Sequence, residues 1–215
     1  RTYPTQTIKT TVARCKIMSY SDFDLKKIKS LFNITIVENT DLFFNTPEIQ
    51  ISDLLKQLLN QNVPLALAIG TEKASSELII INILLELKRS CGIALFSGIE
   101  FNVDKELGLN GYCDFIISLS TEQLFLETPI IALVEAKNEK IISGLGQCIA
   151  EMLAAQRYNQ QDNKNVPIIY GIVTTGQTWK FLKLIEQTVY IDIADYYINQ
   201  PEKILGILTE MIKPS

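Results

Sequence analysis

The chain has 215 residues, of which 47% are hydrophobic and 20% are charged, a balance typical of a folded domain rather than a disordered chain. Its formal net charge of −4 argues against a surface made for non-specific binding of nucleic acid, although an acidic metal site could still carry a local basic rim. No apolar run approaches the roughly 18 residues that span a bilayer, and no secretory leader is expected. We therefore expect a single compact domain in the cytoplasm, without a membrane partner.

The composition also removes several kinds of catalytic chemistry. Histidine is absent, which excludes Ser–His–Asp and Cys–His nucleophile systems and any His-containing zinc site. The cysteines form no CxxC pair and lie among apolar residues, so we interpret them as reduced, buried thiols. They are Cys15, Cys91, Cys113 and Cys148. Acid–base work would have to come from carboxylates, Lys, Tyr, Cys or a metal-bound water.

The first 70 residues are expected to form an N-terminal extension that packs on the rest of the chain. Ser21 or Asp22 is expected to cap its first helix, and the second helix is expected to end near Asn60, before Pro64. The expected elements are a weakly alternating strand and two amphipathic helices, at 7–17, 24–32 and 51–61.

Residues 71–215 carry the main pattern of helices and strands. The stretch 129–137 is an almost continuous apolar run, which is typical of a central strand buried on both faces. Three strands precede the second helix of this region, so we expect an α/β fold with a mixed central sheet flanked by helices. The expected elements are a helix at 71–92, strands at 93–101, 112–120 and 129–137, a helix at 147–159 that follows Gly144 and Gly146, a strand at 166–175, a hairpin of 178–184 and 189–193, and a helix at 201–212.

Two carboxylates and a lysine are expected near the end of that central strand. Glu135 and Lys137 follow the run IIALV and, being two residues apart, project from the same face of a strand. Charges at the end of a buried strand cost several kcal/mol unless they are paired or bind a metal. Asp114, in the neighbouring strand, could add a second carboxylate, and Mg²⁺ prefers such oxygen ligands. Lys137 could then hold a water and stabilise charge on a phosphate.

This arrangement resembles the PD-(D/E)XK nuclease superfamily, whose fold is called restriction-endonuclease-like, over roughly residues 72–184. Asp114 and the triplet Glu135-Ala136-Lys137 match its D…(D/E)xK motif, with 20 residues between the two acids. The expected order of elements matches its αβββαβ core. The resemblance therefore implies that core within residues 71–215, together with a C-terminal hairpin and helix.

Further segments resemble members of the same superfamily. Gln147 matches a Gln in the helix after the ExK strand, and Glu77 stands where the first core helix of many members supplies another acid. TTGQTWKF resembles a hairpin of restriction-type members, and GYCDFIIS, VEAKN and GQCIAEM resemble segments of cyanobacterial members without an established activity. Cys113 replaces the Pro before the first acid and Glu151 replaces a Tyr of one branch. Neither change removes a metal ligand, and the substrate class stays open.

The resemblance implies a nuclease that hydrolyses phosphodiester bonds of nucleic acid, with DNA favoured, and that uses Mg²⁺, for which Mn²⁺ could substitute. Two carboxylates and one backbone carbonyl would bind the metal, those of Asp114, Glu135 and Ala136. Lys137 would position the attacking water, and Gln147 and Glu77 would support these catalytic residues.

Structural alternatives stay open for each of these features. The chain could be a non-catalytic module that keeps the fold for protein binding or oligomerisation, for example as a homodimer, and its acidic balance without a basic stripe supports that alternative. Asp114 and Lys137 could form only a buried salt bridge, and Glu77 could be a solvated helix end. Trp179 is expected to pack in a hairpin rather than stack on a base.

Overall fold

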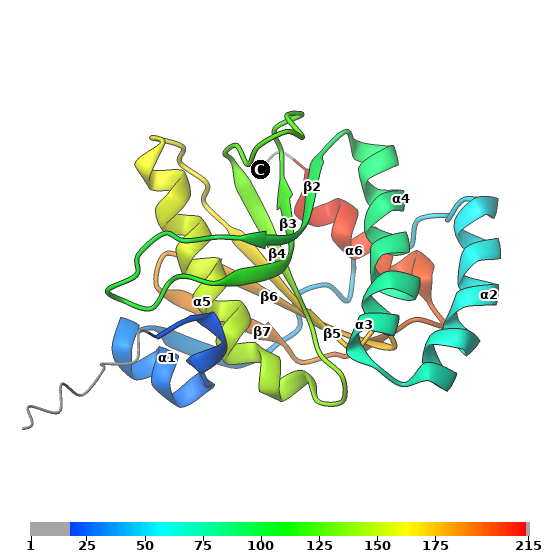
Figure 1. Cartoon of the computed structure of the whole chain (residues 1–215), viewed down its shortest axis with the longest axis horizontal. Helices are drawn as coiled ribbons and strands as arrows, with labels where there is room; N and C mark the ends of the chain where they lie inside the picture. Colours follow the sequence, from blue (N-terminus) through cyan, green and yellow to red (C-terminus); the bar gives the residue numbers. More distant parts are fainter. Residues whose placement is uncertain (1–17, 214–215) are drawn as a thin grey trace, which may run out of the picture.

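A computed structural model describes residues 18–213, in which helices cover both faces of one mixed sheet (Figure 1). The strand expected over 7–17 lies outside the described residues. The strands are β1 (Thr35–Thr40), β2 (Ala94–Glu100), β3 (Tyr112–Ser118), β4 (Ile130–Ala136), β5 (Ile169–Thr174), β6 (Thr178–Ile185), β7 (Thr188–Asp192) and β8 (Tyr196–Tyr197). The helices are α1 (Leu25–Phe32), α2 (Asp53–Ile69), α3 (Glu72–Ser75), α4 (Ile81–Cys91), α5 (Ile141–Gln161) and α6 (Pro201–Met211), with a 3₁₀ turn η1 (Tyr20–Asp22) and a π-helical turn η2 (Ser76–Ile80).

The sheet has the order β1-β7-β6-β5-β4-β3-β2, and β8 pairs with β6. Strands β2, β3 and β4 are antiparallel neighbours, whereas β4 and β5 are parallel and are connected by α5. Strands β5, β6 and β7 form an antiparallel meander, and β1 joins its edge parallel to β7. The expected α/β fold with a mixed sheet flanked by helices is therefore confirmed.

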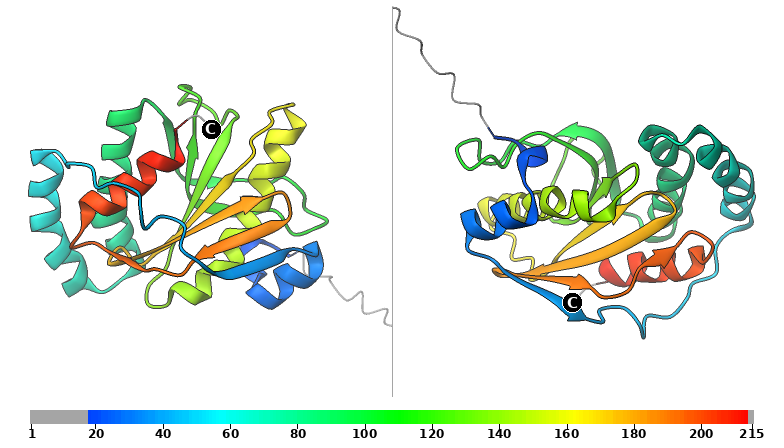
Figure 2. Two further views of the ribbon diagram at one scale, coloured as in Figure 1. Left: turned by 180° about the vertical axis from the view of Figure 1, so that it is seen from behind. Right: turned by 90° about the horizontal axis from the view of Figure 1, so that it is seen from below.

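Two hydrophobic cores lie on opposite faces of this sheet (Figure 2). Helices α4 and α6 cover one face, and α2 packs outside α4. Helix α5, with α1 beside it, covers the other face. Along a β-strand, successive side chains point to opposite faces of the sheet. The residues of β4 therefore fall into two sets, one facing α4 and α6 and the other facing α5.

Strand β4 is buried along its whole length, as expected from its continuous apolar run. Val134 and Ala136 belong to the core beneath α4 and α6, whereas Leu133 belongs to the core beneath α5. By the same alternation, Glu135 and Lys137 face α5. The first residues of α5 therefore lie over the charged end of this strand.

The N-terminal part differs from the expectation in three places. Helix α1 is capped by Asp24, whose side chain accepts the N–H of Lys27, rather than by Ser21 or Asp22. Helix α2 continues through Pro64 and ends at Ile69, and beyond the proline Ala66 is still buried in the core. Strand β1 was not expected from the sequence, and its partner β7 lies about 150 residues away.

Helix α5 begins at Ile141, earlier than the glycine positions suggested. Gly144 and Gly146 lie inside the helix, where they permit close contacts. A Cβ atom on Gly144 would lie 2.7 Å from Val173 Cγ1, and one on Gly146 would lie 2.5 Å from the carbonyl oxygen of Phe23. These glycines therefore let α5 approach β5 and η1, and they do not mark the helix start.

The other expectations on helices and cysteines can be compared directly with the structure. The long helix expected over 71–92 begins with Thr71 as its N-cap and is interrupted by the π-helical turn η2. Within the described residues, no helix is both long and apolar enough to cross a bilayer. Cys113 and Cys148 are buried free thiols, and Cys91 is a half-buried one.

Candidate functional site

The charged end of β4 lies beside the start of β3, and this brings Asp114 next to the ExK triplet. The antiparallel register pairs Phe115 with Val134, and Asp114 and Glu135 are the next residues along the two strands. The charge of Asp114 acts on the Glu135 carboxyl group, so the two acids lie close together. One carboxylate oxygen of Asp114, Oδ2, accepts the backbone N–H of Ala136 at 2.8 Å. The two acids expected from the sequence therefore do lie together, on neighbouring strands.

The carboxyl group of Glu135 is almost fully enclosed, with 2% of the residue exposed. Its Oε1 atom accepts a hydrogen bond from Lys137 Nζ, which is also its ion-pair partner. Burial and then the nearby charge of Asp114 raise the pKa of Glu135 to about 7, although the Lys137 ammonium acts in the opposite direction. The free carboxylate is therefore costly here, and another positive partner would stabilise it.

The ammonium of Lys137 is held between a strand and a helix. Besides Glu135, its Nζ donates to Gln147 Oε1 at 3.2 Å, and its backbone N–H donates to the carbonyl of Thr174 at 2.8 Å. Burial lowers the pKa of Lys137, but the charge and hydrogen bond of Glu135 outweigh it, so the pKa lies above its ordinary value. Lys137 is therefore a charged, positioned donor.

Gln147 lies in the second turn of α5, not at the helix start as expected, so the free backbone N–H groups of the first turn lie away from it. Its Nε2 donates to Glu151 Oε1 at 3.1 Å, one turn further along the helix. The Gln147 side chain therefore joins Lys137 to a fully buried carboxyl group.

Glu151 is a site residue that the sequence had indicated only as a replacement for Tyr. Burial, followed by the charge of Glu135, holds the pKa of Glu151 well above its usual range. Within residues 18–213, two buried side-chain oxygens have no donor, Glu135 Oε2 and Glu151 Oε2. The two carboxyl groups are within hydrogen-bonding reach of each other when one of them carries a proton. Glu151 could have been identified from the sequence, because it lies four residues after Gln147 on the same Ala-rich face of the helix.

A hollow of about 280 Å³ opens beside this network. It is lined by Glu72, Lys73, Ser76, Glu77, Ser97, Gly98, Asp114 and Ala136. The side chain of Glu77 is 64% exposed and forms an ion pair with Lys73 at 3.5 Å, so it lies on the rim of the hollow rather than in the network. Glu72 lies on the same rim, and its charge contributes to the raised pKa of Lys137. Glu72 was not among the site residues expected from the sequence.

The oxygen atoms near the charged end of β4 are candidate ligands for Mg²⁺. In the described part of the chain, no three acidic or sulfur side chains are grouped so that they could hold a metal together. Asp114, Glu135 and the Ala136 carbonyl offer oxygen atoms only, and the buried Glu135 Oε2 lacks a protein donor. Because Mg²⁺ commonly binds through one or two carboxylates and keeps several waters, these residues fit one such ion.

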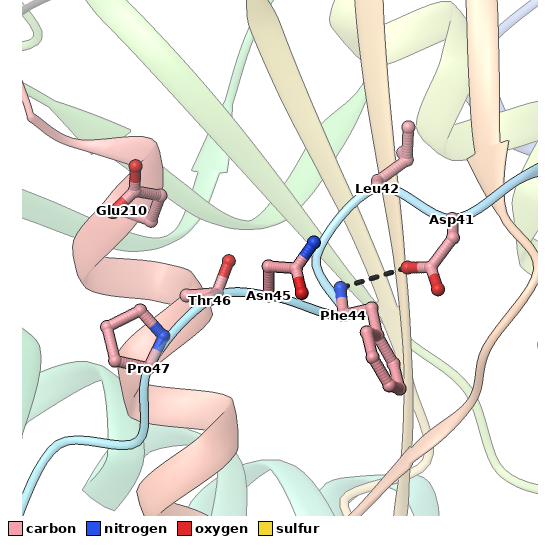
Figure 3. A pocket seen from close by; sticks show the side chains of 7 residues that line it. All are labelled: Asp41, Leu42, Phe44, Asn45, Thr46, Pro47 and Glu210. Carbon is pink, nitrogen blue, oxygen red and sulfur yellow. Dashed lines mark hydrogen bonds between the residues drawn. The ribbon is translucent and has the colours of Figure 1, made fainter.

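Two other features lie away from this network. Trp179 is buried, and its Nε1 donates to the carbonyl of Gly176 at 3.1 Å, so it packs in the hairpin as expected. A hollow of about 340 Å³ lies between 41–47 and Glu210 of α6 (Figure 3). There, Asp41 accepts the backbone N–H of Phe44 at 2.9 Å. The residues expected to be catalytic do not line this second hollow.

Comparisons of the chain with family models, with curated proteins and with solved structures found no match. A functional assignment therefore has to come from the chemistry of the network itself.

Proposed function

We propose that this chain is a Mg²⁺-dependent nuclease with a restriction-endonuclease-like core, and that it hydrolyses phosphodiester bonds of nucleic acid, with DNA as the expected substrate. One observation carries this proposal. The ammonium of Lys137 is held jointly by Glu135 and Gln147, and Asp114 lies beside them on the neighbouring strand, where its carboxylate accepts the Ala136 N–H. The element order α4-β2-β3-β4-α5-β5 supports it.

Electrostatics around the hollow support a requirement for a divalent cation. Four carboxyl groups surround or adjoin it, those of Glu72, Glu77, Asp114 and Glu135, against two lysines, Lys73 and Lys137. A phosphodiester would be repelled by this balance unless a cation compensates the carboxylates. Bound Mg²⁺ would supply that charge and lower the pKa of a bound water.

The protein residues would bind the metal ion and donate a hydrogen bond to the reacting groups. Asp114, Glu135 and the Ala136 carbonyl would hold the ion. An ammonium has three N–H donors, and Glu135 and Gln147 take two of those of Lys137, which leaves one for the attacking water or a phosphate oxygen. A donor fixed in advance stabilises charge in the transition state more effectively than a mobile one.

The test is cleavage of linear, circular and single-stranded DNA, and of RNA, with Mg²⁺, with Mn²⁺ and with a chelator. We expect cleavage with either cation, and its loss with the chelator and in Asp114→Asn. Glu38→Gln is the matched control, because Glu38 is an exposed acid on the edge strand β1. Absence of cleavage from every substrate, or equal cleavage by Asp114→Asn, would reject the proposal.

A second candidate is a non-catalytic module of the same fold that binds another protein or a second copy of itself. Two observations favour it. Glu135 is only 2% exposed, and its Oε1 atom is bonded to Lys137 within the protein. Helix α2 also leaves a row of apolar side chains in solvent, with Leu54, Leu65 and Ile69 about half exposed. Light scattering of wild type and Leu65→Glu tests it, since a dimer formed through α2 should dissociate in the variant.

A further inference from the structure

The side chain of Glu151 is fully buried beneath the candidate site, and the proposed reaction gives it no role. Its Oε1 atom accepts the Nε2 donor of Gln147, whose Oε1 in turn accepts Lys137 Nζ. These three side chains therefore form one continuous chain of hydrogen bonds that ends at the ammonium.

We propose that Glu151 is a positioning residue that fixes the orientation of the Gln147 amide and, through it, the position of the Lys137 ammonium. The inference rests on the proposed nuclease function, because the lysine is the same one. It adds a residue that does not touch substrate or metal.

The hydrogen-bonding groups of Lys137, Gln147 and Glu151 allow only one orientation of the Gln147 amide. A glutamine amide can rotate by half a turn with little change in shape, which exchanges its oxygen and its NH₂ group. Lys137 Nζ can only donate, so it requires the oxygen of Gln147, and this orientation turns the NH₂ group of Gln147 towards Glu151. Oε1 of Glu151 accepts that group whether or not the carboxyl carries a proton.

Loss of that acceptor would release the amide. With an apolar side chain at 151, the Gln147 NH₂ group would point into a dry part of the protein without a partner, which costs free energy. The amide could avoid this cost by rotating, but it would then present N–H groups to the ammonium. Lys137 would keep Glu135 alone as its acceptor and would gain freedom about its long side chain.

The packing beneath the lysine shows that its position is restricted. Gly144 lies so close that a Cβ atom there would be 2.9 Å from Lys137 Cγ. Because Lys137 fits between Gly144 of α5, Gln147 and Glu135, a small movement of the amide is transmitted to the ammonium. A displaced ammonium still attracts a phosphate but no longer meets the transition state, so kcat should fall more than KM rises.

The experiment compares Glu151→Leu with Glu151→Gln in the whole chain. Glutamine reproduces the carbonyl oxygen that Gln147 needs and supplies an N–H towards Glu135, whereas leucine supplies neither. We expect Glu151→Leu to lower kcat for DNA cleavage about tenfold or more, with KM changed less than about twofold, and Glu151→Gln to stay near wild type. Gln147→Met should match Glu151→Leu, and the double variant should lose little more, because both changes break one chain of hydrogen bonds.

A readout without cleavage uses ¹⁵N NMR of the lysine ammonium groups. The signal of Lys137, identified by its loss in Lys137→Met, should be retained in Glu151→Gln and weakened or lost in Glu151→Leu and Gln147→Met. Equal behaviour of the Leu and Gln variants, or an unchanged signal in both Glu151→Leu and Gln147→Met, would overturn the inference. If Glu151→Leu does not fold, Gln147→Met decides the same question. A wild type that cleaves nothing would reject the nuclease, while the NMR comparison would still decide the role of Glu151.

Discussion

The stability of the protein should fall as the pH rises through the range in which Glu135 loses its proton. In the folded protein the pKa of Glu135 is about 7, against an ordinary value of 4.5. Between these values the folded state holds a proton that the unfolded chain has released, so the free energy of unfolding decreases with pH. At roughly 1.4 kcal/mol per pH unit, the contribution of Glu135 is about 3 kcal/mol, and it is fully lost above pH 7.

Urea unfolding at several pH values between 4.5 and 8, without divalent cations, measures this loss. Glu151, whose pKa is also raised, adds a decrease of its own, so Glu135→Gln should make the pH dependence shallower without removing it. Glu38→Gln, which changes an exposed carboxyl group, should leave the dependence as in wild type. Equal dependence in wild type and Glu135→Gln would refute the reasoning, because the buried carboxyl would then not titrate as its surroundings require.

Three further outcomes are expected. At pH 8, Mg²⁺ or Mn²⁺ should raise the melting temperature of wild type and not of Glu135→Gln; equal shifts would place the cation elsewhere. Gly144→Ala should cost about 1–3 kcal/mol of unfolding free energy by urea titration and should lower cleavage, because its Cβ would press on Lys137; an unchanged cleavage rate would contradict this. Asn159→Leu should cost about 2 kcal/mol or more, because the Asn159 amide bonds both the N–H and the carbonyl of Ile130, at 2.8 and 2.7 Å; a neutral effect would show that water replaces it.

The parts of the fold that depend on local pattern could be predicted from the sequence. The apolar run of β4, the strands β2 and β3 and the β6–β7 hairpin were all expected, because each depends on a pattern within a short stretch of sequence. Strand β1 could not be found in this way. Its stretch TIVENT is half polar, and its parallel pairing with β7 depends on residues about 150 positions away.

In the candidate site, too, local sequence patterns predict some residues, whereas others depend on how distant segments pack. Glu135 and Lys137 converge through period-two alternation within β4, and Asp114 lies near them because β3 is the neighbouring strand. Glu77 was expected in an uninterrupted helix over 71–92, whereas the π-helical turn η2 changes the number of residues per turn at that position. The role of Glu151 depends on how deeply α5 is buried, which the sequence of that helix alone does not reveal.

The most direct test of the central claim is the rate of DNA cleavage by Lys137→Ala at saturating Mg²⁺, compared with wild type. If the ammonium acts in the transition state, the rate should fall by roughly a hundredfold or more, while DNA binding in the presence of the cation survives. A variant that cleaves DNA as fast as wild type, or a wild type whose cleavage does not depend on the cation, would contradict the account.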